Sequence, residues 1–207
     1  MQRKFYQIIF VFIAACGLPG MLHAHPGHGL GFTSGLAHPL TGLDHLLAMI
    51  AVGVLAALQT RSDRMRIVVL PLIFTTGVFI CGVSAMFGLQ WPAYFVEAAI
   101  AASVAIFGAL ILFTARRAQT MNGALNAAAI IGVLFFAVAH GQAHGQELPA
   151  LANASQYAVG FVISTLLLHL AGVLIGGFAG TSARTLTAVR AAGGAMTVIG
   201  IGLLAGI

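Results

Sequence analysis

Long apolar runs separated by short polar gaps form the pattern of this chain. Six runs lie at approximately 37–59, 67–87, 93–114, 123–143, 155–178 and 188–207. Each run is close to the roughly 20 residues that an α-helix needs to cross the hydrocarbon of a bilayer. The gaps between them are too short to hold a soluble domain. The pattern therefore predicts an all-α fold, a polytopic membrane bundle of six transmembrane helices in a single domain over residues 25–207.

The first 24 residues have the layout of a secretory signal peptide. Two basic residues precede an apolar core that extends to about residue 15, and small residues lead up to Ala24. This order is typical of a cleavable signal, and we predict that residues 1–24 are removed by cleavage after Ala24. Two alternatives are processing at Cys16, which ends a short lipoprotein-like segment, and an uncleaved anchor helix.

Composition points to the same class of protein. Hydrophobic residues make up 60% of the chain and charged residues 6%, whereas a soluble domain carries about 25% charged residues. The nine basic residues form no patch with interleaved aromatics, so nucleic-acid binding is not expected. If the amino terminus starts in the cytoplasm and the spans alternate, all nine fall on the cytoplasmic side, as the positive-inside rule requires. We therefore expect a multi-pass protein of the bacterial inner membrane, embedded in the lipid bilayer, with both mature termini in the periplasm.

Ionisable side chains are rare in this chain, and most of those near apolar runs gather at the edges of the first and fourth runs. They are His38, Asp44, His45, His140, His144 and Glu147. Ionisable groups are expensive near hydrocarbon and usually functional there. Imidazole nitrogens and carboxylate oxygens suit a borderline divalent metal such as Ni, Co or Zn. Because the first run begins outside and the fourth ends outside, both groups reach the same membrane face, and we predict that they share a metal site.

In the first group, Pro39 favours a helix that begins near His38, because a backbone N–H in the first helical turn has no partner within the helix and proline loses nothing by lacking it. Such a helix places His45 and Met49 on roughly the same face. Asp44 lies about 100° from His45 around the helix axis. It can therefore ligate from the side, or it can accept a hydrogen bond that orients an imidazole.

In the second group, His140 and His144 are four residues apart and share one helical face. Glu147 continues that face if the helix persists to Pro149. The alternative is a surface loop in which both histidines are solvated.

Two further ionisable residues lie inside apolar runs. Glu97 is in the outer part of the third run, and we expect it to face the bundle interior because a carboxylate in lipid is costly. His169 is near the middle of the fifth run. It is either a ligand deeper along a path or a hydrogen-bonded core residue. Both are included among the candidate metal-site residues.

These motifs resemble the HupE/UreJ family of small membrane proteins associated with nickel-dependent hydrogenase and urease systems. The matching segments are His38-Pro39-x-x-Gly42-x-Asp44-His45-x-x-x-Met49, Phe136-x-x-x-His140-Gly141-x-x-His144-Gly145-x-Glu147, and Tyr157-Ala158-x-Gly160-Phe161 followed by Thr165 and His169. Val96-Glu97 with Ser103 also resembles the family's third span. The resemblance implies a nickel or cobalt permease of about six spans with a cleaved signal. The family's motif residues map to His38, Asp44, His45 and His140, while His144 and Glu147 match a more variable part.

The expected function is import of Ni²⁺ or Co²⁺ from the periplasm to the cytoplasm, with the metal as transported substrate, no cofactor and no enzymatic activity. The chain lacks a Gly-x-x-x-x-Gly-Lys-Ser/Thr loop, so we do not expect it to hydrolyse ATP. One alternative is an intramembrane hydrolase in which the same residues hold a zinc ion that activates water. Another is a metal sensor or insertion partner without net flux. The choice between nickel and cobalt, the coupling ion and assembly into a homo-oligomer stay open.

Overall fold

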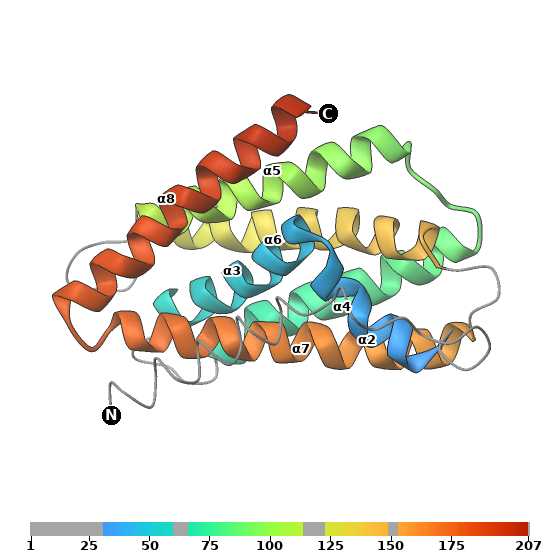
Figure 1. Cartoon of the computed structure of the whole chain (residues 1–207), viewed down its shortest axis with the longest axis horizontal. Coiled ribbons are helices and arrows are strands. Elements are labelled where there is room, and N and C mark those ends of the chain that lie inside the picture. The colour runs from blue at the N-terminus through green and yellow to red at the C-terminus, as the bar shows by residue number, and fades with distance from the viewer. Residues whose placement is uncertain (1–30, 60–65, 114–122, 149–152, 207) are drawn as a thin grey trace.

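The computed structural model describes residues 31–59, 66–113, 123–148 and 153–206 (Figure 1). Its seven helices are α2 (Phe32–Thr41), α3 (Leu43–Gln59), α4 (Arg66–Met86), α5 (Ala93–Leu112), α6 (Gly123–Gln146), α7 (Ala154–Ala179) and α8 (Ala183–Gly206). The described residues contain no strand, so the predicted all-helical class is confirmed. The predicted signal peptide and Cys16 lie outside the described residues.

Five of the described helices, α4 to α8, are long and apolar enough to cross a membrane. The pair α2 and α3 would add a sixth span if the two helices are counted together, although they meet at an angle of 86°. The five to six candidate spans follow the six predicted apolar runs closely. A multi-pass membrane protein is the architecture that these helices build.

The junction between α2 and α3 differs from the prediction of one helix that begins near His38. Pro39 lies inside α2, close to its end, and Gly42 has an extended backbone with φ −94° and ψ 120°. Proline removes one backbone donor from a helix, and the hydroxyl of Thr41 donates to the carbonyl of His38 at 2.8 Å. The chain therefore leaves α2 at Thr41, turns at Gly42 and starts a new helix at Leu43.

Helix α3 is the central helix of the bundle. Its residues 51–58 are all buried, and it packs against α2, α4, α5, α6 and α7. A helix that is apolar on every face is stable only where all faces are covered. Around it, α5 and α8 lie side by side, as do α4 and α6 (Figure 1). Their outward faces carry large exposed apolar side chains such as Leu72, Ile80 and Ile201, as expected for contact with lipid.

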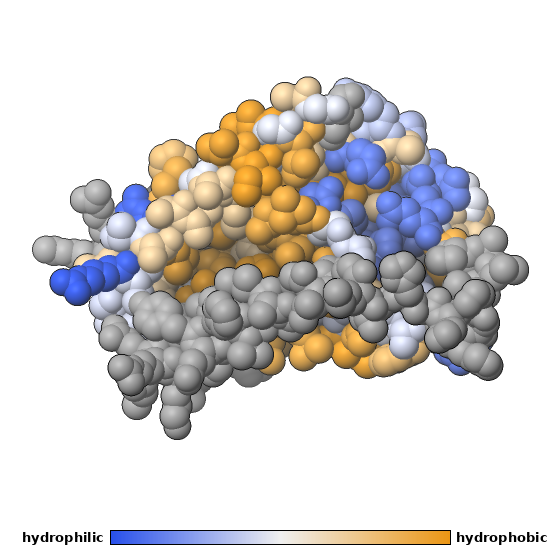
Figure 2. All heavy atoms as spheres, viewed as in Figure 1, coloured by the Kyte–Doolittle hydropathy of each residue, from blue (hydrophilic) through white to orange (hydrophobic). Residues whose placement is uncertain are grey.

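Small residues let the helix pairs approach to backbone contact, as is common in membrane bundles. A Cβ added at Gly145 of α6 would meet the carbonyl oxygen of Gly82 in α4. A Cβ added at Gly53 of α3 would meet the carbonyl oxygen of His169 in α7. Figure 2 shows hydrophobic residues over the middle of the visible face, a large group of hydrophilic residues toward the end where α2 joins α3, and a smaller one at the opposite end. The polar side chains thus lie toward the two ends of an apolar bundle.

Candidate functional site

Four imidazoles from three helices converge at the polar end of the bundle. His38 comes from the last turn of α2, His45 from the start of α3, and His140 and His144 from the end of α6. The ring of His144 lies 4.8 Å from that of His38 and 4.7 Å from that of His45, centroid to centroid. The ring of His140 lies 5.2 Å from that of His45. We call these four residues the imidazole cluster; it joins two segments about one hundred residues apart in the sequence.

The bend at Gly42 explains how His38 and His45 meet. In one straight helix, seven residues would separate them by about 10 Å along the axis. With α2 turned by 86° relative to α3, the two ring centroids are 6.1 Å apart. The break that the sequence pattern did not predict is therefore what brings the two histidines of this motif together.

Asp44 holds the ring of His45 in one orientation. Its Oδ1 atom lies 2.8 Å from Nδ1 of His45 and also accepts the backbone N–H of His45 at 2.8 Å. A carboxylate that accepts from Nδ1 fixes the tautomer and leaves the Nε2 lone pair free for a metal. The Nε2 atom of His45 is buried and has no hydrogen-bond partner among the described residues. Of the two roles considered for Asp44, the geometry favours the orienting one.

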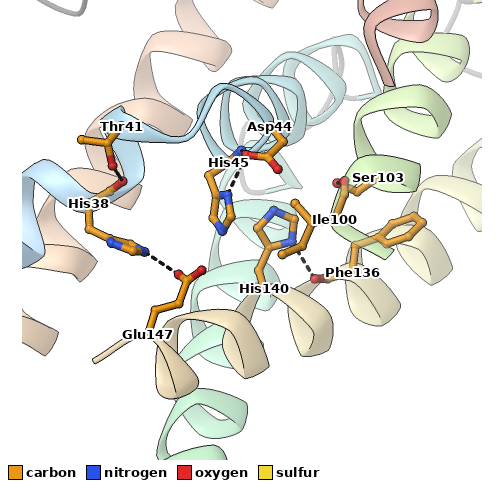
Figure 3. Close-up of polar contacts among 9 residues, drawn as sticks. All are labelled: His38, Thr41, Asp44, His45, Ile100, Ser103, Phe136, His140 and Glu147. Carbon is orange, nitrogen blue, oxygen red and sulfur yellow. Dashed lines mark hydrogen bonds and ion pairs between the residues drawn. The ribbon is translucent and has the colours of Figure 1, made fainter. Parts of the chain in front are cut away.

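His140 is oriented in the same way by a backbone group. Its Nδ1 atom lies 2.9 Å from the carbonyl oxygen of Phe136 (Figure 3). Because a carbonyl oxygen only accepts, the proton must sit on Nδ1, and the Nε2 lone pair is then available. The side chain of His140 is fully buried, and Nε2 has no partner within the described part of the chain. His45 and His140 thus each present one unprotonated nitrogen to the interior.

His144 occupies the middle of the imidazole cluster. Its side chain is buried, and neither ring nitrogen has a hydrogen-bond partner among the residues described. Its ring also packs at 4.2 Å, centroid to centroid, against that of Phe161 in α7. Since His140 and His144 lie within α6 and are buried, the alternative of a loop with solvated histidines is wrong.

Glu147 supplies a carboxylate at the rim of the cluster, just beyond the end of α6. Its Oε2 atom lies 3.0 Å from Nε2 of His38 (Figure 3). The hydrogen bond from His38 holds the pKa of Glu147 below its ordinary value of 4.5, so the carboxylate is ionised at neutral pH. One ligand atom from each of His38, His144 and Glu147 lies within 4.8 Å of the others. Glu147 is exposed and His38 is partly exposed, whereas His144 is buried, so an arriving cation meets Glu147 and His38 first.

Two glutamines of α6, which the sequence reasoning did not single out, tie the neighbouring loop to the site helix. Gln142 accepts the backbone N–H of Trp91 at 2.8 Å and donates to the carbonyl of Leu89 at 3.0 Å. Gln146 donates to the carbonyl of Trp91 at 3.2 Å. The two glutamines alternate in sequence with His140 and His144, and this alternation is the only sequence feature that indicates a role for them at the site. They fix the end of α6 and thereby the two histidines it carries.

Glu97 does not face the bundle interior, and that prediction was wrong. Its side chain is exposed on α5, whose buried positions near it are Val96, Ala99 and Ile100. Because α5 is apolar on nearly every face, the sequence pattern does not indicate which side points inward. Glu97 lies about one turn from the start of α5, where a long side chain can extend to the polar boundary of the bilayer. It is still close enough to interact electrostatically with Asp44 and Glu147.

His169 is also separate from the imidazole cluster. The ring of Phe74, whose role the sequence reasoning missed, lies between the two, with its centroid 5.2 Å from that of His140 and 5.4 Å from that of His169. The side chain of His169 is 1% exposed. The structure therefore places one buried histidine apart from the other four.

Comparisons with known proteins agree on one family. Residues 13–203 match the family model described as HupE / UreJ protein. The chain is similar to a curated relative, Protein HupE of Rhizobium leguminosarum bv. viciae, with 37% identity over 202 residues that cover 97% of this chain and 99% of the relative. No solved structure matches the chain significantly.

Proposed function

The chain belongs to the HupE/UreJ family, and from this premise we propose that it is a permease that imports Ni²⁺ or Co²⁺ from the periplasm into the cytoplasm. The observation that carries the proposal is the imidazole cluster with its ionised carboxylate, placed at one end of helices long enough to cross a membrane. In this proposal the metal is the transported substrate and the chain is not an enzyme.

The donor set fits these ions. Imidazole nitrogens with a carboxylate oxygen are ligands that nickel and cobalt accept readily. Two donors on opposite sides of a transition-metal ion are about 4 Å apart, from metal–nitrogen distances near 2.1 Å. The ligand atoms of His38, His144 and Glu147 lie within 4.8 Å of one another, so a small contraction would close them around an ion. A site that must contract to bind can also release, which is what a permease requires.

Charge supports the inward direction. The basic residues Arg184 and Arg190 belong to the first turns of α8, which begins at the end of the bundle opposite the junction of α2 and α3 (Figure 1). The positive-inside rule favours the cytoplasmic side for such residues, and in this proposal the cluster therefore opens to the periplasm. A divalent cation that moves inward gains about 4–5 kcal/mol per 100 mV of membrane potential. That energy can drive uptake without ATP.

The proposal includes residues 1–24 as a cleaved signal peptide and residues 25–207 as one domain of the bacterial inner membrane. Beyond His38, His144 and Glu147, it assigns His45 and His140 as ligands, Asp44 as the residue that orients His45, and Glu97 as an attractive charge near the mouth. The comparisons give no support to the zinc-hydrolase alternative.

Uptake of radioactive nickel by intact cells tests this proposal. Cells that lack their own high-affinity nickel transporter should accumulate more nickel when they express the chain than when they carry an empty vector. The His144→Ala variant should lose this gain, whereas Gly132→Ala, placed in the same helix where a methyl group meets only ordinary contacts, should retain it. Equal accumulation with and without the wild-type protein in the membrane fraction would refute a transport role.

A further inference from the structure

His169 is a buried histidine that does not belong to the imidazole cluster. Its side chain is 1% exposed, and neither Nδ1 nor Nε2 has a hydrogen-bond partner among the described residues. Buried polar atoms in native proteins are nearly always paired, and each exception requires an explanation such as an unseen water or ion. A packed core histidine would ordinarily donate to a backbone carbonyl, as His140 does.

Thr165 adds a second unpaired donor atom on the same side of α7. It precedes His169 by four residues, so the two side chains share a face of the helix. Its hydroxyl is fully buried and also lacks a partner within the described residues. An imidazole and a hydroxyl without partners therefore lie together in an apolar interior, where leaving both unpaired costs free energy.

The two side chains lie deeper in the bundle than the imidazole cluster. The backbone of His169 is level with Gly53, since a Cβ on Gly53 would meet the carbonyl oxygen of His169. Gly53 is eight residues beyond His45 in α3, which corresponds to about 12 Å along the helix axis. The ring of Phe74 occupies the space between, in edge contact with His140 on one side and His169 on the other. His169 therefore follows His140 on a line from the polar end toward the other end of the bundle.

We propose that His169 and Thr165 form a second metal-binding site, on the inner side of Phe74, which a divalent transition-metal ion occupies after it leaves the imidazole cluster. The inference rests on the proposed transport function, because a deeper site has a use only if the metal moves inward. One imidazole nitrogen, one hydroxyl and retained water would hold the ion more weakly than the cluster does. A weaker second site allows release toward the cytoplasm.

Transport kinetics of the purified, reconstituted full-length chain provide the first test. In the His169→Leu variant the maximal rate of nickel uptake should fall at least tenfold, while the equilibrium affinity for nickel at the outer cluster should change less than twofold. Leu168→Val, a change in packing at the neighbouring buried position, should leave both values near wild type. Wild-type rates in His169→Leu, with wild-type transport intact, would overturn the second site and leave the proposed function standing.

Binding of Co²⁺ provides a readout that does not depend on transport. With the outer cluster disabled by His45→Ala and His144→Ala, the purified chain should still bind one Co²⁺ ion weakly, with visible absorption bands typical of a nitrogen ligand. Adding His169→Leu should abolish these bands, and adding Leu168→Val should not. Co²⁺ bands that persist after His169→Leu, or no binding in the double variant, would overturn the site even if the wild-type chain moved no metal at all.

Discussion

Gly145 is a position at which a single methyl group would disturb the imidazole cluster through a contact between two helices. It follows His144 in α6 and faces α4. A Cβ at this position would meet the carbonyl oxygen of Gly82 and would lie 2.6 Å from the Cβ of Ala85, whereas ordinary contacts begin near 3.4 Å. The contact with Ala85 alone would require the two helices to separate by roughly 0.8 Å, the difference between these distances, and the closer contact with the Gly82 carbonyl would require more.

A displacement of that size should weaken the site without destroying the fold. Overpacking of a core costs about 1–3 kcal/mol of stability, which a bundle of this size can tolerate. The imidazole of His144 and the carboxylate of Glu147, whose backbone N–H donates to the carbonyl of Ala143 in α6, would move with the helix, and their distances to His38 and His45 would no longer suit one ion. Misplacing a supporting group near a metal typically costs 10–100-fold in affinity. We expect Gly145→Ala to raise the half-saturating nickel concentration for uptake by about that factor.

The matched control is Gly132→Ala in the same helix. There the added Cβ would lie 3.4 Å from Cε1 of Phe107 and 3.9 Å from the ring of Phe136, so the methyl group fits. Uptake curves for both variants should be measured at equal protein levels in the membrane. If the Gly145→Ala curve coincided with the Gly132→Ala curve, the inferred coupling between the contact of α4 with α6 and the metal site would be refuted.

Three further outcomes are expected. Asp44→Ala should abolish nickel uptake, whereas Asp44→Asn, which keeps an acceptor beside His45 without the charge, should raise the half-saturating concentration about 10–100-fold; unchanged uptake in both would contradict the orienting role. Lowering the external pH from about 7.5 to about 5.5 should also raise that concentration, because a proton and a metal ion compete for the same imidazole nitrogen. Glu147 should not contribute to this pH effect, since the hydrogen bond from His38 keeps its pKa below 4.5 and the carboxylate stays ionised above that pH. A half-saturating nickel concentration that stays constant over this pH range would argue against a histidine-lined entry. A reporter enzyme that works only in the periplasm should be active when it is fused after Ile207. Activity at the same position of a reporter that works only in the cytoplasm would overturn the proposed six-span orientation.

The length and helical nature of the candidate spans could be predicted from the sequence because they depend on local composition. A run of about 20 apolar residues can satisfy its backbone in a bilayer only as a helix. The observed helices α4 (Arg66–Met86) and α7 (Ala154–Ala179) match the predicted runs closely for this reason. The meeting of the segments around His45 and His140 at one end of the bundle could also be predicted, because successive spans alternate in direction.

The bend and the orientation of individual faces could not be predicted in the same way. Pro39 and Gly42 both break helices, but the same two residues fit a helix that begins at His38 as well as a helix that ends shortly after it. The inward or outward position of Glu97 depends on which face of α5 packs on α3 and α6, and an apolar helix carries little periodic signal for that choice. His144 matched a variable part of the family motif, yet it lies at the centre of the cluster because α6 continues to Gln146.

The central claim is that the imidazole cluster passes a divalent metal through the membrane, and flux into proteoliposomes tests it most directly. Purified wild-type chain should take up radioactive Ni²⁺ without ATP, faster when the lumen is made electrically negative, and His45→Ala should reduce this flux to the level of empty vesicles. Nickel that binds the wild-type protein with no accumulation in the lumen at any membrane potential would contradict a permease and would indicate a metal-binding sensor instead.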